Sequence, residues 1–170
     1  MLPFPSPTTP HASRADVLLG YLAYFRSVVL ARLDGLPDEA LRASRLPSGW
    51  SPLELLHHLV HVERRWLVWG FEGQPVAEPW GDQRDGRWHV PPGTGLPELV
   101  RDLCDQAAAT ERVVRAHDLD DVGRPGERWD GEPPATLERV LLHLLQEYAR
   151  HAGHLDVVRE LVDGATGEQL

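Results

Sequence analysis

Hydrophobic residues recur at intervals of three and four in four stretches of the chain, which is the spacing of one face of an α-helix. The first stretch follows Ser13, whose hydroxyl suits a helix N-cap, and ends before Gly35. The second begins at Ser51, which opens the Ser-Pro-Leu-Glu pattern of a capping box, and continues to about Phe71. These patterns predict two helices in the first half of the chain.

Two further helices are predicted in the second half, over residues 96–116 and 136–163. Residues 72–94 and 117–134 are rich in glycine, proline and charge, and we expect both segments to be long loops. No stretch shows the alternation of polar and apolar residues that is typical of a half-buried strand. The chain is therefore predicted to be an all-α protein, a four-helix bundle with long crossover loops.

A length of 170 residues suits one domain, and a hydrophobic content of 42% with six tryptophans is typical of a globular protein. Residues 1–12 contain four prolines, which disfavour a helix there. We expect an extended N-terminal arm over residues 1–12 and a single domain over residues 13–170.

Composition excludes several classes of protein. A net charge of -9 disfavours nucleic-acid binding, which needs a basic face. No apolar run approaches ~18 residues, so we expect no membrane span, and the first residues do not resemble a secretory signal. The single cysteine, Cys104, excludes an intrachain disulfide and favours a reducing, cytoplasmic compartment. We expect Cys104 to be a small core residue.

The last predicted helix carries His143, Glu147, His151 and His154, spaced by four, four and three residues. This spacing aligns them along one side of a helix. Glu147 and His151 lie one turn apart and can point at one ion. Imidazole nitrogen and carboxylate oxygen both bind Zn²⁺ at ~2.0–2.2 Å, and a third protein ligand would leave a coordination position open for chemistry. The alternative is a chance pair that is solvated or hydrogen-bonded.

A third ligand must come from another helix, where the candidates are His57, His58 and His61. His57 and His61 share a face, whereas His58 falls in line with apolar residues that should face the core. His58 is therefore the imidazole predicted to point inward. A buried imidazole needs a partner, and a metal ion would provide it.

His143 and His154 extend the row beyond the reach of one ion, so we expect them to support the ligands or face a substrate. For His154 the alternative is a hydrogen bond to a neighbouring loop. Arg150, beside His151, suits a carboxylate substrate, although an exposed salt bridge is the alternative.

Trp80 and Trp88 lie in the long loop and are candidates to line a cofactor pocket, core packing being the alternative. Other histidines in predicted loops are expected to be solvated: His11, His89 and His117.

The segments GWSPLELLHHL (residues 49–59) and VERRW (62–66) resemble the second helix of the DinB/YfiT-like superfamily. The segment EYARHAGHLDVVRE (147–160) resembles its fourth helix, most closely that of the actinobacterial mini-circle-type branch. The resemblance spans residues 14–167. It implies a four-helix bundle that holds a divalent metal through three side chains.

In that superfamily one ligand is a histidine eight residues after the tryptophan of the second helix, which corresponds to His58. The other two lie four residues apart on the last helix, which corresponds to Glu147 and His151. Many members have histidine at both of these places. A His-Glu-His set resembles the mycothiol-dependent maleylpyruvate isomerases of the same superfamily.

The resemblance implies a detoxification enzyme, a divalent-metal-dependent transferase or isomerase that uses a low-molecular-weight thiol such as mycothiol on a small electrophile. Zinc is the expected metal, and nickel or iron would suit the same ligands. Family likeness also implies a homodimer. In this hypothesis His154 is a proton carrier. A metal-dependent hydrolase and a non-catalytic metal-binding bundle remain alternatives.

Overall fold

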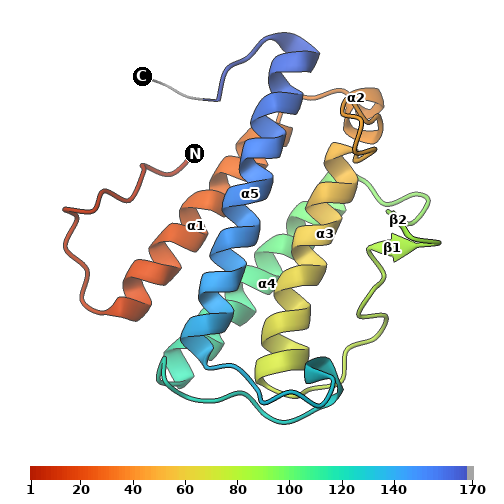
Figure 1. Cartoon of the computed structure of the whole chain (residues 1–170). Coiled ribbons are helices and arrows are strands. Elements are labelled where there is room, and N and C mark those ends of the chain that lie inside the picture. Colours follow the sequence, from red (N-terminus) through yellow and green to blue (C-terminus); the bar gives the residue numbers. More distant parts are fainter. Residues whose placement is uncertain (168–170) are drawn as a thin grey trace.

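Four long helices lie side by side and form the body of the protein in the computed structural model, which describes residues 1–167 (Figure 1). The four are α1 (Arg14–Leu33), α3 (Pro52–Arg64), α4 (Leu96–Ala116) and α5 (Leu137–Asp163). Helix α3 continues directly into a π-helical segment, η1 (Arg65–Phe71). The predicted all-α bundle is confirmed.

The two long connections take different courses. Residues 72–95 return along the length of the bundle, so α3 and α4 run in the same direction (Figure 1). Residues 117–136 stay at the end of the bundle where α4 ends and α5 begins, and they include the short 3-10 helix η2 (Glu127–Trp129). The first connection therefore lies over α3, the helix that carries His57, His58 and His61.

The predicted helix boundaries follow from local capping. The Ser13 hydroxyl accepts a hydrogen bond from the Asp16 N–H at 3.1 Å. Ser51 and Glu54 form the reciprocal bonds of a capping box, at 3.3 and 2.8 Å. Gly164 ends α5 in the left-handed region with φ of 75°. Each cap is a feature of a few adjacent residues, which explains why sequence alone could place it.

Two short elements depart from the predictions. Helix α2 (Asp38–Arg42) was not predicted, because five residues are too few to show a helical period. It packs on α3 through its buried apolar residues. The prediction of no strand is wrong for a small hairpin of β1 (Gln83–Arg84) and β2 (Arg87–Trp88). Each strand has only two residues, joined by an Asp-Gly turn with positive φ at both positions.

Residues 1–12 form no helix or strand and pack against α1. The Phe4 ring meets the Tyr24 ring edge-on, with centroids 5.2 Å apart. The Leu2 N–H donates to the Ser27 hydroxyl at 3.0 Å. These contacts hold the segment along the outer side of α1 (Figure 1).

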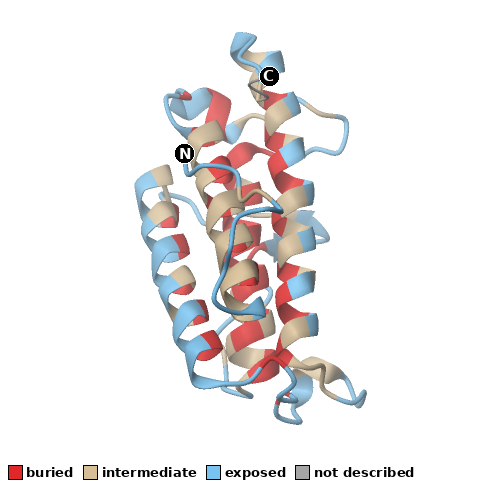
Figure 2. Cartoon of the chain, turned by 90° about the vertical axis from the view of Figure 1, so that its left-hand side faces the viewer, coloured by how far each residue is buried: buried red, intermediate tan, exposed pale blue. Residues whose placement is uncertain are grey.

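The core lies between the four helices, where their buried sides face one another (Figure 2). It is built mainly of leucines and valines whose side chains are almost completely excluded from solvent. Helix α5 packs against α1 and α3, and α4 packs mainly against α3. This arrangement places the inner side of α5 directly opposite that of α3.

One buried carboxylate connects all four long helices. Glu63 on α3 accepts hydrogen bonds from Arg26 on α1, Thr110 on α4 and Tyr148 on α5. Tyr148 donates at 2.6 Å, and the Glu63 side chain has no exposed surface. We infer that this cluster, made of a fully hydrogen-bonded carboxylate and its three donors, fixes the relative positions of the helices.

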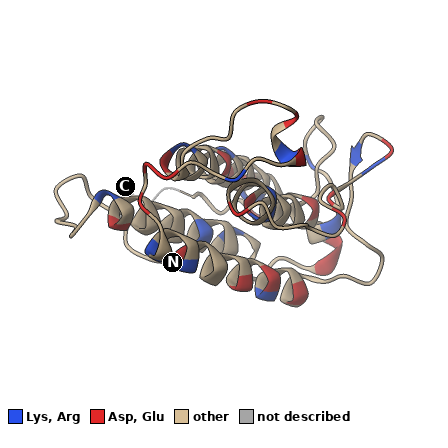
Figure 3. Ribbon diagram, turned by 90° about the horizontal axis from the view of Figure 1, so that it is seen from below, with Lys and Arg blue, Asp and Glu red and all other residues tan. Residues whose placement is uncertain are grey.

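On the surface, acidic and basic residues are intermixed along the helices and loops (Figure 3). Within the described residues no helix combines the length and apolarity needed to cross a bilayer. Cys104 is exposed, so its predicted place in the core is wrong. Leu103 takes the inward position on α4, and the next residue lies about 100° around the helix.

Candidate metal centre

Three of the predicted ligand side chains meet between α3 and α5. The Nε2 atoms of His58 and His151 lie 3.6 and 3.3 Å from the Glu147 Oε2 atom. One donor atom from each residue can be chosen so that all three lie within 4.8 Å of one another. His58 and His151 are 7% and 3% exposed, and Glu147 is partly buried. The three side chains form a cluster that can hold a metal ion.

The position of each side chain follows from its helix. Glu147 and His151 are one turn apart on α5 and lie on its side toward α3. On α3 the capping box fixes the first turn, and His58 stands two turns further on. His58 turns its Nε2 atom toward Glu147 on α5, as expected from its position on α3. Burial alone does not single it out, because His57 and His61 are also buried.

A buried acid from the long loop orients His58. The Asp82 Oδ2 atom lies 2.8 Å from His58 Nδ1, and the Asp82 carboxylate has no exposed surface. Arg65, at the start of the π-helical segment, donates to both Asp82 oxygens at 2.6 and 3.1 Å. Because Asp82 accepts the Nδ1–H, the His58 Nε2 atom that faces Glu147 is the one available to a metal.

The charge of Asp82 is fixed by the same contacts. Burial raises its pKa, but the hydrogen bonds from His58 and Arg65 outweigh burial and lower it to about 2. Asp82 is therefore ionised at neutral pH. No role was predicted for Asp82 or Arg65 from the sequence. For Asp82 the only available signal was the length of the loop that carries it.

The donor set fits a divalent cation. Bonds of ~2.0–2.1 Å in a tetrahedral zinc site place neighbouring donor atoms about 3.4 Å apart, close to the two observed separations. The facing imidazoles of His151 and His58 hold the pKa of the Glu147 carboxyl well below its usual range. Burial lowers the pKa of His151. An ionised acid beside a neutral imidazole is the state that binds a metal.

Two tryptophans enclose the ligands. The Trp50 ring lies 4.9 Å from the His151 ring and 5.5 Å from the His58 ring, between centroids. Trp88 from the hairpin lies 4.2 Å from both His58 and Trp50. The structure therefore brings Trp88 beside the candidate ligand His58, although Trp88 is not among the residues that line the two hollows described below. No function was predicted for Trp50 itself, although it belongs to the motif that carries the family resemblance.

Trp80 lies apart from the ligands. Its side chain is 49% exposed and stacks on the Arg65 guanidinium, 4.5 Å from the ring centroid. The structure does not bring the Trp80 ring to the cluster. Trp80 is connected to His58 only indirectly, because Arg65, on which it stacks, donates to Asp82, and Asp82 accepts from His58.

The outer histidines of the α5 row flank the ligands. His143 Nε2 lies 3.5 Å from Glu147 Oε1, and its ring is 4.5 Å from that of Trp66. Burial lowers the pKa of His143. His154 Nδ1 lies 3.2 Å from His151 Nδ1, so its partner is the neighbouring ligand and not a loop.

His57 and His61, which share the other face of α3, are also buried. Their Nε2 atoms are 3.1 Å apart, and the His57 Nδ1–H donates to the His89 carbonyl at 2.8 Å. They lie under the long loop, outside the cluster. His89 itself is half-buried, so its predicted solvation is wrong, whereas His11 and His117 are exposed.

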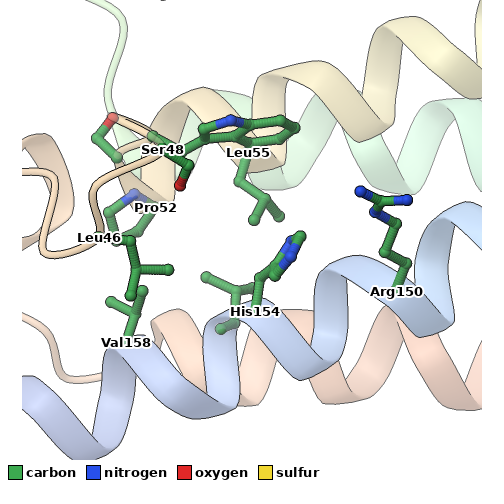
Figure 4. A pocket seen from close by; sticks show the side chains of 10 residues that line it. Leu46, Ser48, Pro52, Leu55, Arg150, His154 and Val158 are labelled. Atoms are coloured by element: carbon green, nitrogen blue, oxygen red, sulfur yellow. The ribbon is translucent and has the colours of Figure 1, made fainter.

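A cavity of about 150 Å³ adjoins the cluster between α5 and the start of α3 (Figure 4). His154 and Leu55 point into it from opposite sides, and Arg150 stands at one end. Its lining residues are Leu46, Ser48, Trp50, Ser51, Pro52, Leu55, Arg150, His154, Leu155 and Val158. Trp50 and His154 contact both the cavity and the ligands, so they connect the two.

A second hollow, of about 460 Å³, lies on the other side of Glu147 along α5. Trp66, His143 and, from η2, Trp129 are among the residues that line it, and His143 also contacts Glu147. The candidate ligands therefore lie between two spaces. This arrangement suits a reaction between two small molecules.

Comparison with known proteins agrees with this geometry. No curated protein matches the chain. A model of the family described as Mycothiol-S-transferase matches residues 17–164, a range that includes all three candidate ligands and both hollows. The resemblance to the DinB/YfiT-like, mycothiol-related superfamily is thereby confirmed. The match covers well over half of the sequence, and the chain belongs to the mycothiol S-transferase family.

Proposed function

We propose that the protein is a divalent-metal-dependent S-transferase that joins mycothiol to a small-molecule electrophile, in cytoplasmic detoxification. The observation that carries the proposal is the convergence of His58, Glu147 and His151 between two hollows. Three protein ligands leave a coordination position open, as in catalytic metal sites. Zinc is the expected ion, and nickel or iron suits the same donors.

A divalent cation held by His58, Glu147 and His151 would lower the pKa of a thiol bound at the open position. Asp82 keeps His58 Nε2 directed toward Glu147, and Glu147 contributes a negative charge that offsets that of a cation. Trp50 and Trp88 exclude water from one side of the ligands. A weakly hydrated site strengthens each electrostatic contact within it.

The remaining steps use side chains at the cavity. His154 lines the cavity and contacts His151, so it can take up the thiol proton and release it to solvent. A carbon–sulfur bond then forms to the electrophile, and the electron pair of the broken bond leaves with the displaced group. Trp88, beside His58, is proposed to contact the thiol.

The test combines metal analysis with conjugation. Protein purified without a histidine tag is analysed for bound metal, and mycothiol is reacted with 1-chloro-2,4-dinitrobenzene with and without a chelator. We expect one metal ion per chain, activity that is lost on chelation and restored by zinc, and no activity in His58→Ala. His117→Ala, which removes an exposed histidine, is the matched control.

Conjugation that persists in chelated His58→Ala would overturn the proposal. Consumption of an electrophile without any thiol would instead indicate a metal-dependent hydrolase. The homodimer that family likeness implies is tested separately, by light scattering of the purified protein.

A further inference from the structure

The cavity of Figure 4 has a mostly apolar wall close to the candidate ligands. Leu55, Leu155 and Val158 line it and are 3%, 2% and 4% exposed. Their side chains come from α3 and α5, two packed helices, so the space is held open by the fold. Filling it with an apolar group removes hydrocarbon surface from water, at roughly 25 cal/mol per Å².

The size of the cavity limits what enters it. A cavity of about 150 Å³ lined by leucines, as in a known engineered case, accommodates one benzene ring. The ring of Trp50 forms one wall and also packs on His151, one of the candidate ligands. A single aromatic ring held here lies next to the place where a thiol would be activated.

One end of the cavity carries an unpaired cation. Arg150 projects from α5 at that end (Figure 4), and within residues 1–167 its guanidinium forms no ion pair with any acid. Arg159 on the same helix differs, because it pairs with Asp163 at 2.9 Å. A free guanidinium binds a carboxylate through two parallel hydrogen bonds.

We propose that this cavity is the binding site of the electrophile, and that it selects single-ring aromatic electrophiles that carry a carboxylate. The ring occupies the apolar cavity and the carboxylate binds Arg150. This inference rests on the proposed S-transfer and names the substrate class of that site. In the reaction with a chloroarene, the thiol sulfur bonds to the ring carbon, chloride leaves with the electron pair of the carbon–chlorine bond, and the thiol proton passes to solvent.

The test measures binding without turnover. Two ligands that differ only in the carboxylate, 3,5-dinitrobenzoate and 1,3-dinitrobenzene, are titrated calorimetrically into zinc-loaded protein in the absence of thiol. Arg150→Met is expected to weaken the benzoate about tenfold, the loss of one charge-assisted interaction, and the neutral ring less than about twofold. Arg112→Met on α4, an exposed residue outside the cavity lining, is the matched control and should change neither.

A second variant tests the cavity itself. Ser48 is exposed at the rim, so Ser48→Phe should fold normally and obstruct the space, weakening both ligands. Equal effects of Arg150→Met on both ligands, or unchanged binding in Ser48→Phe, would overturn the inference. Because neither ligand reacts, the two failures can be told apart: the expected binding pattern in a protein that fails to conjugate mycothiol would refute the proposed function, and the cavity would remain a binding site for aromatic carboxylates without a role in S-transfer.

Discussion

Two acids on facing helices, the fully buried Glu63 and the partly buried Glu147, have opposite surroundings. Glu63 receives hydrogen bonds from a guanidinium, a hydroxyl and a phenol, so its charge is compensated within the protein. Glu147 faces three imidazoles at 3.3 to 3.6 Å and contacts no arginine or hydroxyl among the described residues. The first cluster is complete without a ligand, whereas the second gathers metal-binding atoms around a common point.

The pKa shifts follow the same division. Burial and the Glu63 charge raise the pKa of Tyr148, which keeps its proton and donates it to Glu63. Burial lowers the pKa of His151, which leaves a lone pair available. The Glu63 cluster consists of donors that satisfy an acceptor. The Glu147 cluster combines a carboxylate with imidazole nitrogens, all of which can present lone pairs to one cation.

The largest expected effect is the loss of unfolding free energy when the Glu63 cluster is broken. Glu63→Ala leaves the Arg26 guanidinium buried without its partner, and loss of one member of a buried ion pair costs about 3–5 kcal/mol of unfolding free energy. Urea denaturation followed by circular dichroism measures it. The double variant Arg26→Met/Glu63→Leu, which removes both charges, should be more stable than Glu63→Ala. A loss below about 1 kcal/mol would show that this cluster does not hold the bundle together.

Replacement of Glu147 should affect metal binding and leave the metal-free fold almost unchanged. Glu147→Ala should leave the stability of the metal-free protein within about 1 kcal/mol of wild type, because Glu147 has no buried cation to compensate. The same variant should lose the rise in Tm that zinc gives the wild type, since only a bound ligand stabilises the folded state. Thermal melts with and without zinc measure both effects. If metal-free Glu147→Ala were as unstable as Glu63→Ala, the distinction between the two clusters would be lost.

The sequence predicted those features that depend on near neighbours along the chain. Helix boundaries came from caps such as Ser51 and Gly164, and the pairing of Glu147 with His151 came from their spacing of one turn. His58 could be chosen because its neighbours on α3 form an apolar face. In each case the physical information lies within about two helical turns.

Features that depend on distant contacts were not predictable. Asp82 reaches His58 only because the 72–95 connection returns along α3, and nothing in its flanking residues marks it. Glu63 lies in a segment that reads as an ordinary helix, and its partners come from three other helices. The π-helical turn that starts at Arg65 has no sequence pattern of its own.

Asp82 lies outside the three candidate ligands and orients one of them, His58. Asp82→Asn keeps the shape of the side chain but removes the charge that holds His58, so zinc affinity should fall by about 10–100-fold. A competition titration with a chelating dye measures the affinity. Asp85→Asn, in the exposed hairpin turn, is the control and should bind zinc as wild type does. Equal affinities in all three proteins would exclude an orienting role for Asp82.

The smallest expected effect is a pH dependence in the Glu63 cluster. Because burial and Glu63 raise the pKa of Tyr148 in the folded protein, its contribution to stability is present below the phenol's ordinary value of 10.0 and is lost at higher pH, where only the unfolded chain ionises readily. Between pH 9 and 11 the unfolding free energy of wild type should therefore fall more steeply than that of Tyr148→Phe. Tyr21→Phe, which removes a phenol on the outer side of α1, should keep the wild-type slope. Parallel curves for wild type and Tyr148→Phe would mean that Tyr148 ionises as easily in the folded protein as in the unfolded chain, and that Glu63 does not hold its proton in place.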